Sequence, residues 1–123
     1  MVTDRRDIPA NTGAYATEAE ALRVVVDRIV GAVQPVSIYL FGSRARGDHR
    51  PDSDFDLLVV TRESDGDAGY DFERVYAPVL GTGIGCDVVP CREDDFIRQS
   101  TSPTGLVREV LDDGIRLYDS QGT

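Results

Sequence analysis

The sequence contains no lysine, because all 13 of its basic residues are arginines, and it has 22 acidic residues. This absence excludes enzymes that act through a lysine, such as Schiff-base enzymes, lysyl-adenylate ligases and P-loop nucleotide-binding proteins. The formal net charge of -9 also disfavours general affinity for the DNA or RNA backbone, which binds basic surfaces. We therefore expect no direct nucleic-acid binding.

Histidine and cysteine are also scarce, and long apolar runs are missing. The single histidine, His49, and the two cysteines, Cys86 and Cys91, are too few for a zinc site or a disulfide framework. We expect both thiols to stay reduced in the core and His49 to be an exposed loop residue. No stretch approaches the roughly 18 apolar residues of a membrane span, and the N-terminus lacks the apolar segment of a signal peptide. These absences predict a soluble cytoplasmic protein without membrane contact.

The length of 123 residues is typical of one domain with a single core. Residues 1–14 are polar, lack periodicity and contain Pro9 and Gly13, which predicts a flexible N-terminal tail. We expect the folded domain to cover residues 15–119 and a short C-terminal tail to cover residues 120–123.

The order of patterned segments predicts an α+β fold with a mixed sheet of about four strands flanked by helices. The sequence TEAE is typical of a capped helix start at Thr17, with Glu20 reaching back, and the helix should end near residues 31–35. Runs rich in β-branched and aromatic residues predict the strands, and periodic runs predict further short helices. The expected strands are 36–41, 55–60, 83–90 and 115–119, the further helices are 71–80, 92–100 and 102–114, and a flexible loop is expected over 61–71.

Two neighbouring acids stand where the second predicted strand begins. Side chains two positions apart in a strand share a face, so Asp54 and Asp56 should lie roughly 6.6 Å apart at Cα. Asp87 joins them if its strand is the neighbour. Carboxylates about 4 Å apart repel by roughly 4 kcal/mol at an effective dielectric near 20, and a hard divalent cation relieves that repulsion. We predict that these three acids form a catalytic site that binds Mg²⁺, or Mn²⁺ in its place.

A glycine-serine turn after the first predicted strand offers a place for an anion. Gly42 can take strained backbone angles and lets a ligand approach, while Ser43 could cap a short helix with outward-pointing amides. Arg44 and Arg46 follow, and each could contact a phosphate or pair with surface acids instead. The four residues are therefore predicted to bind phosphate groups.

The segment GSRARGDHRPDSDFD matches the GS-x10-DxD signature of the DNA-polymerase-beta-like nucleotidyltransferase superfamily. In particular, GSRARG followed by SDFDLLVV resembles its minimal nucleotidyltransferase (MNT) branch, and the later CDVV and DDGIRLYD are similar to that branch over residues 17–119. The resemblance implies that Ser43 contacts the phosphates of ATP and that Asp54 and Asp56 bind two metal ions. It also implies that Asp87 binds one ion and helps to activate an acceptor hydroxyl, to which AMP is transferred.

The resemblance also implies a partner. Larger superfamily members carry a helical domain for the acceptor, and here one core uses nearly all the residues, so a partner or a second copy is expected to hold it. MNT domains are commonly antitoxins that adenylylate a HEPN-type toxin, in a type VII-like toxin-antitoxin pair. Two alternatives stay open: a contact antitoxin that masks its partner without catalysis, and an adenylyltransferase of small molecules such as antibiotics. The acceptor, the preferred nucleotide and the homo- or hetero-oligomeric state are not fixed by the sequence.

Overall fold

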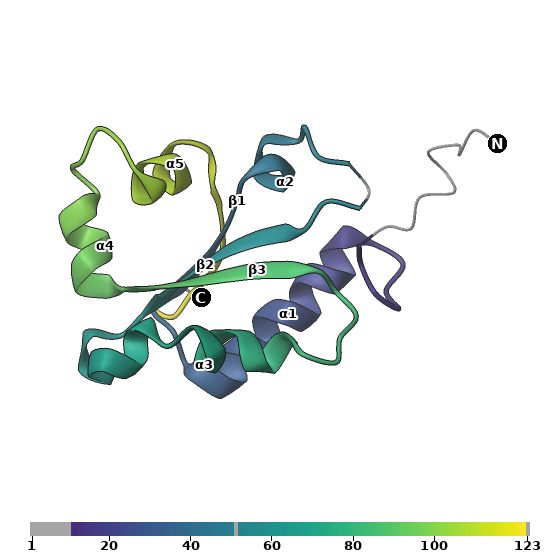
Figure 1. Ribbon diagram of the computed structural model, residues 1–123, viewed down its shortest axis with the longest axis horizontal. Coiled ribbons are helices and arrows are strands. Elements are labelled where there is room, and N and C mark those ends of the chain that lie inside the picture. The colour runs from purple at the N-terminus through teal and green to yellow at the C-terminus, as the bar shows by residue number, and fades with distance from the viewer. Residues whose placement is uncertain (1–10, 51, 123) are drawn as a thin grey trace.

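The protein forms a four-stranded mixed sheet with helices on both faces in its computed structural model, which describes residues 11–50 and 52–122 (Figure 1). The strand order is β3-β2-β1-β4, with β1 antiparallel to β2 and β4, and β2 parallel to β3. The strands are β1 (Ser37–Phe41), β2 (Phe55–Thr61), β3 (Cys86–Arg92) and β4 (Ile115–Asp119). This arrangement confirms the predicted α+β fold class.

Five α-helices accompany the sheet in the described residues. They are α1 (Glu18–Val33), α2 (Ser43–Arg46), α3 (Phe72–Tyr76), α4 (Glu93–Gln99) and α5 (Leu106–Asp113). The first helix starts as predicted, because the Thr17 side chain accepts a hydrogen bond from the backbone N–H of Glu20. The Glu20 carboxylate in turn accepts from the N–H of Ala16, so amides at the helix start are satisfied from both directions.

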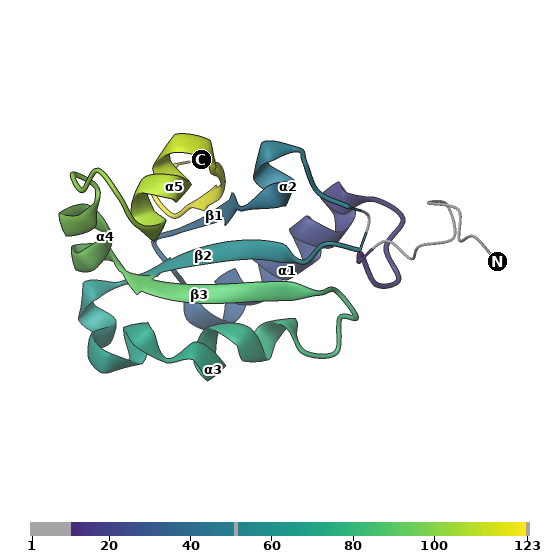
Figure 2. The ribbon, with the colours of Figure 1, turned by 45° about the horizontal axis from the view of Figure 1, so that its top comes forward.

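The core occupies both faces of the sheet. Helices α1 and α3 cover one face, and α2, α4 and α5 cover the other (Figures 1 and 2). Alternate residues of β2 enter the two layers: Leu57 and Val59 pack with α1 and α3, whereas Leu58 and Val60 pack with α5. Burial on both faces explains why this strand reads as a continuous apolar run rather than an alternating one.

The connection between β2 and β3 corrects the prediction of a flexible loop over 61–71. It contains a 3₁₀ segment, η2 (Glu63–Tyr70), in which two helical turns meet at Gly66 with a φ of 61°, and then α3 and η3 (Ala77–Val79). The Thr61 hydroxyl donates to the Gly69 carbonyl at 2.8 Å, and Arg74 donates to Asp65 at 3.1 Å. The first bond ties the connection to the end of β2, and the second holds η2 against α3.

The N-terminal tail was predicted over residues 1–14. Residues 1–10 lie outside the described part of the chain, and residues 11–14 lie within it. Residues 11–14 differ from the prediction, because Thr12 is buried and pairs with Ile84 in an isolated β-bridge ahead of β3. At the other end, the Ser120 N–H donates to the Val36 carbonyl at 2.9 Å and extends the contacts of β4, while residue 123 lies outside the description. None of the helices in the described part of the chain is long and apolar enough to span a membrane.

Candidate active site

Three carboxylates come together where β2 and β3 begin. Asp56 is the second residue of β2 and lies in register with Asp87, the second residue of β3, on strands that run about 4.8 Å apart. Asp54 directly precedes β2. Asp56 shares the strand parity of Leu58, so both acids of the pair belong to the face covered by α2 and α5 (Figure 2). The predicted neighbourhood of the three acids is therefore present, and their catalytic roles remain predictions.

The electrostatics of this cluster centre on Asp56, which is half-buried while Asp54 and Asp87 are exposed. Burial raises the pKa of Asp56 above the ordinary carboxyl value, and the negative charges of Asp87, Asp54 and Glu109 raise it further. The Arg46 guanidinium lowers the same pKa but does not cancel the rise. The site thus holds an excess of negative charge that a cation would relieve.

The donor chemistry of the cluster fits a hard divalent cation such as Mg²⁺, because carboxylate oxygens on adjacent strands are the ligands such ions take. In the described residues, no three His, Cys, Asp or Glu side chains are arranged so that they could hold a metal ion. One of the expected ligands, Asp54, has its Oδ1 engaged by the side-chain amide of Asn11 at 2.7 Å. Binding of an ion therefore requires the carboxylates of Asp56 and Asp87 to move closer to that of Asp54, and the two-ion arrangement stays a prediction.

Gly42 has two reasons to be glycine, of which the sequence predicts the first. Its φ of 74° and ψ of -155° belong to a region that residues with a Cβ avoid. A Cβ at this position would also collide with Oδ2 of Asp56. The turn after β1 thus presses directly against the half-buried acid, and the close approach that was expected of a ligand is made here by a side chain of the protein.

The helix after this turn begins differently from the prediction. Gly42 is the N-cap residue of α2 and Ser43 is its first helical residue, so the serine is not the cap, and no side-chain capping bond forms. The short helix nevertheless places Ser43 directly after the glycine that touches Asp56. Its contact with a phosphate stays a prediction.

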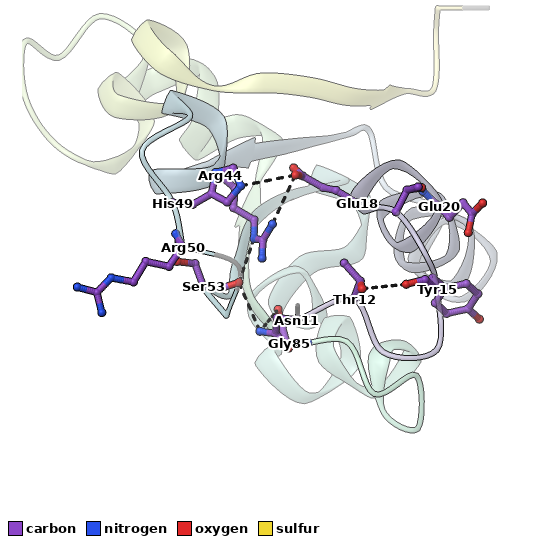
Figure 3. Close-up of polar contacts among 11 residues, drawn as sticks. Asn11, Thr12, Tyr15, Glu18, Glu20, Arg44, His49, Arg50, Ser53 and Gly85 are labelled. Carbon is purple, nitrogen blue, oxygen red and sulfur yellow. Dashed lines mark hydrogen bonds and ion pairs between the residues drawn. The ribbon is translucent and has the colours of Figure 1, made fainter. Parts of the chain in front are cut away.

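The two arginines of α2 have different surroundings, although they are two positions apart. The Arg44 side chain is only 3% exposed, donates from Nε to the Ser53 carbonyl at 2.9 Å and lies 3.4 Å from Glu18 (Figure 3). Its guanidinium carbon stacks 4.0 Å from the ring centroid of Phe55. His49 lies at the edge of this group, with Nε2 3.8 Å from Glu18, and is less exposed than predicted. The geometry assigns Arg44 to holding the loop before β2, which does not favour its predicted contact with phosphate.

Arg46 instead faces the acid cluster. It is exposed and pairs with Asp48 at 3.3 Å and with Glu109 of α5 at 3.6 Å. Of the two arginines, Arg46 is therefore the one placed to meet an anion beside Asp56. The expectation that it contacts phosphate remains a prediction, which this position favours.

Two residues near the acids escaped the sequence reasoning. Glu109 is brought to Arg46 and Asp56 by the packing of α5 on the sheet, and Asn11 reaches Asp54 from the segment predicted to be a tail. Neither stands at a recognisable spacing from the GS-x10-DxD segment. To predict these two residues, one would need to know which segments pack beside the start of β2.

The cysteines belong to the core and not to the chemistry of the site. Cys86 and Cys91 are free and buried, as expected. Burial, together with the charge of Asp54, raises the pKa of Cys86 to about 12, so its thiol stays protonated at neutral pH. A protonated thiol is a poor nucleophile, which leaves the carboxylates as the reactive groups near β3.

Comparison with known proteins agrees with this geometry. The sequence profile of the family described as polymerase beta, nucleotidyltransferase matches residues 27–123. A crystal structure from Sulfolobus solfataricus, provisionally described as a nucleotidyltransferase, superposes with a TM-score of 0.52 and 20% identity over 87% of this chain and 92% of that one, which shows a shared fold. None of the curated proteins matches. The matched family region contains the glycine-serine turn and all three acids, and the chain therefore belongs to the polymerase-beta-like nucleotidyltransferase family.

Proposed function

We propose that this chain is a metal-dependent nucleotidyltransferase that moves AMP from ATP to a hydroxyl group of a partner protein. The observation that carries the proposal is the register of Asp56 with Asp87, beside Asp54 and the Gly42 turn, inside the region that matches the family. In the reaction, the acceptor oxygen forms a bond to the α-phosphorus of ATP, and the bond from that phosphorus to pyrophosphate breaks. The hydroxyl proton passes to a carboxylate of the site, for which we propose Asp87.

Each residue of the candidate site has a defined role in this proposal. Asp54, Asp56 and Asp87 would hold the divalent ions, which when bound offset the charge of the phosphates and of the departing pyrophosphate. Ser43 orients the phosphates by a hydrogen bond, and Arg46 is placed to exchange its pairing with Glu109 for a phosphate oxygen. Glu109 thereby keeps the arginine beside the site when no nucleotide is bound.

A protein acceptor is supported by the openness of the site. Asp54 and Asp87 are both exposed, and the acids lie where strands begin at one end of the sheet (Figure 2). A hydroxyl presented from outside can therefore reach them. The resemblance to MNT domains names the class of partner: a HEPN-type toxin, which the chain would silence as an antitoxin by adenylylating the hydroxyl group of a tyrosine.

The test of this proposal uses catalytic amounts of the protein. A small amount is mixed with excess HEPN-type partner, ATP and Mg²⁺, and intact mass spectrometry counts AMP additions. We expect most of the partner to be modified, and the Asp54→Asn variant to add none. If the partner gains no mass while Asp54→Asn still silences it at equal molar amounts, the protein is a contact antitoxin. If only an added small-molecule acceptor is adenylylated, the substrate class in the proposal is wrong.

Ser43→Ala should weaken nucleotide use less than loss of a metal ligand does. Removing one hydrogen bond to a charged phosphate costs about 1 to 3 kcal/mol, because the rest of the site remains in place. The measurement is the ATP dependence of pyrophosphate release, with circular dichroism as the control for folding. A Ser43→Ala variant that uses ATP as well as the wild type would remove the serine from the phosphate site.

A further inference from the structure

The side chain of Asn11 joins the starts of the two strands that carry the acids. Its Nδ2 donates to Oδ1 of Asp54 at 2.7 Å, and its Oδ1 accepts from the backbone N–H of Gly85 at 2.9 Å. Longer contacts of 3.4 Å run from Nδ2 to the carbonyls of Ser53 and Gly85 (Figure 3). One amide thus ties the residue before β2 to the segment that leads into β3.

Gly85 leaves the space that the side chain of Asn11 occupies. A Cβ at position 85 would overlap the side-chain amide of Asn11, whereas the backbone of Gly85 does not have a φ reserved for glycine. Its lack of a side chain is therefore explained by the space that Asn11 occupies. The neighbouring residue Thr12 holds the segment by its bridge to Ile84, so the position of Asn11 does not depend on Asp54 alone.

We propose that Asn11 is a positioning residue that fixes the carboxylate of Asp54 for a divalent cation, an inference that rests on the proposed function. An ionised carboxylate has two oxygens with about four acceptor sites, and Asn11 uses one of these on Oδ1. The remaining lone pairs, including those of Oδ2, stay available to an ion. Groups that hydrogen-bond a metal ligand typically account for about 10- to 100-fold in metal affinity, because they orient the ligand before the ion arrives.

The opposite effect of the same contact would be competition, in which the amide withholds Asp54 from the ion. The two effects predict changes of opposite sign when the amide is removed. Positioning predicts weaker metal binding in Asn11→Ala, and competition predicts tighter binding. Geometry favours positioning, because an amide that also binds Gly85 is held in place and leaves one carboxylate oxygen free.

The experiment measures Mn²⁺ binding to the purified full chain from the electron paramagnetic resonance signal of free Mn²⁺, with Asp54→Asn as the reference for non-specific binding. Asn11→Ala should raise the dissociation constant about tenfold. Gly85→Ala should do the same, because its methyl group displaces Asn11. Thr12→Ala is the matched control: it removes the bond from Thr12 to the Tyr15 carbonyl and should lower the melting temperature without changing Mn²⁺ affinity.

The double variant Asn11→Ala with Gly85→Ala distinguishes displacement of the Asn11 amide from a general loss of folding. Its Mn²⁺ affinity should equal that of Asn11→Ala alone, because the methyl group at 85 then meets no amide. Unchanged or tighter binding in Asn11→Ala, or equal losses in Thr12→Ala, overturns the positioning role. Failure of the proposed function is distinct: the wild type then transfers no nucleotide although the Mn²⁺ difference between variants persists. A wild type that binds Mn²⁺ no better than Asp54→Asn overturns both.

Discussion

Replacing Asp56 with asparagine should lower nucleotide transfer by about 10³-fold or more and, in the absence of divalent ions, raise the melting temperature at neutral pH. The loss of activity follows from removing the acid at the centre of the proposed metal site. The gain in stability follows from the pKa of Asp56, which burial and the neighbouring charges of Asp87 and Asp54 raise. An amide of nearly the same size fills the same space without that charge.

The pH dependence of this effect has a definite sign. Because the folded protein holds the Asp56 proton more tightly than the unfolded chain, stability falls as the pH rises from the ordinary value of 3.8 through the raised folded value. The penalty is absent in acid and grows as the pH rises through this range. The melting advantage of Asp56→Asn should therefore shrink as the pH is lowered.

The measurement compares melting curves and pyrophosphate release in the wild type and the variant. Asp27→Asn, which makes the same chemical change at an exposed position on α1, is the matched control and should alter neither. Added Mn²⁺ should raise the melting temperature of the wild type but not of Asp56→Asn. An Asp56→Asn protein that melts lower than the wild type at neutral pH, or that retains full transfer activity, contradicts the assignment.

Arg44→Ala should lower the free energy of unfolding by about 3 kcal/mol. The change leaves the Ser53 carbonyl with only its longer contact from Asn11. It also removes the buried partner of Glu18 and opens a void over the ring of Phe55. Each of these effects is structural, and none requires a nucleotide. Chemical denaturation monitored by circular dichroism gives the free energy directly.

The matched control for Arg44→Ala is Arg46→Ala, which truncates the exposed arginine of the same helix and should change stability by no more than about 0.5 kcal/mol. Arg46→Ala should instead raise the KM for ATP. The reverse outcome, in which Arg44→Ala keeps its stability and loses ATP affinity, would show that the phosphate contact predicted from the sequence belongs to Arg44.

Much of the fold was predictable because local patterns and tertiary structure agree in this chain. The run FDLLVV forms a strand buried on both faces, and the capped start at Thr17 forms where it was expected. The prediction of a third strand over 83–90 begins too early, because β3 covers Cys86–Arg92. Gly83 has a φ of 73° and interrupts the extended chain, and the strand continues past Pro90 because β3 is at the sheet edge, where a missing N–H is tolerated.

Only those residues of the site that stand at a recognisable spacing in the sequence could be predicted. Asp54 and Asp56 are close in sequence, and Asp87 could be added once its strand was assumed to be the neighbour. Asn11 contacts Asp54 across 43 positions of sequence, and no local pattern records such a contact. The two arginines of α2 are the same residue type in the same segment. Their difference comes from tertiary contacts, because Arg44 packs on Phe55 and bonds to Ser53, whereas Arg46 is exposed.

The parallel pairing of β2 with β3 also determines when the site can form. Asp56 and Asp87 meet only after the chain through η2, α3 and η3 has closed back on the sheet, which is the kind of non-local step that slows folding. We expect the acid cluster to assemble after the folding transition state, because it depends on closing this connection, whereas β4 joins the sheet separately at β1. A cation bound between these strands would then increase kinetic stability: it would slow the unfolding of the folded protein and leave the folding rate unchanged.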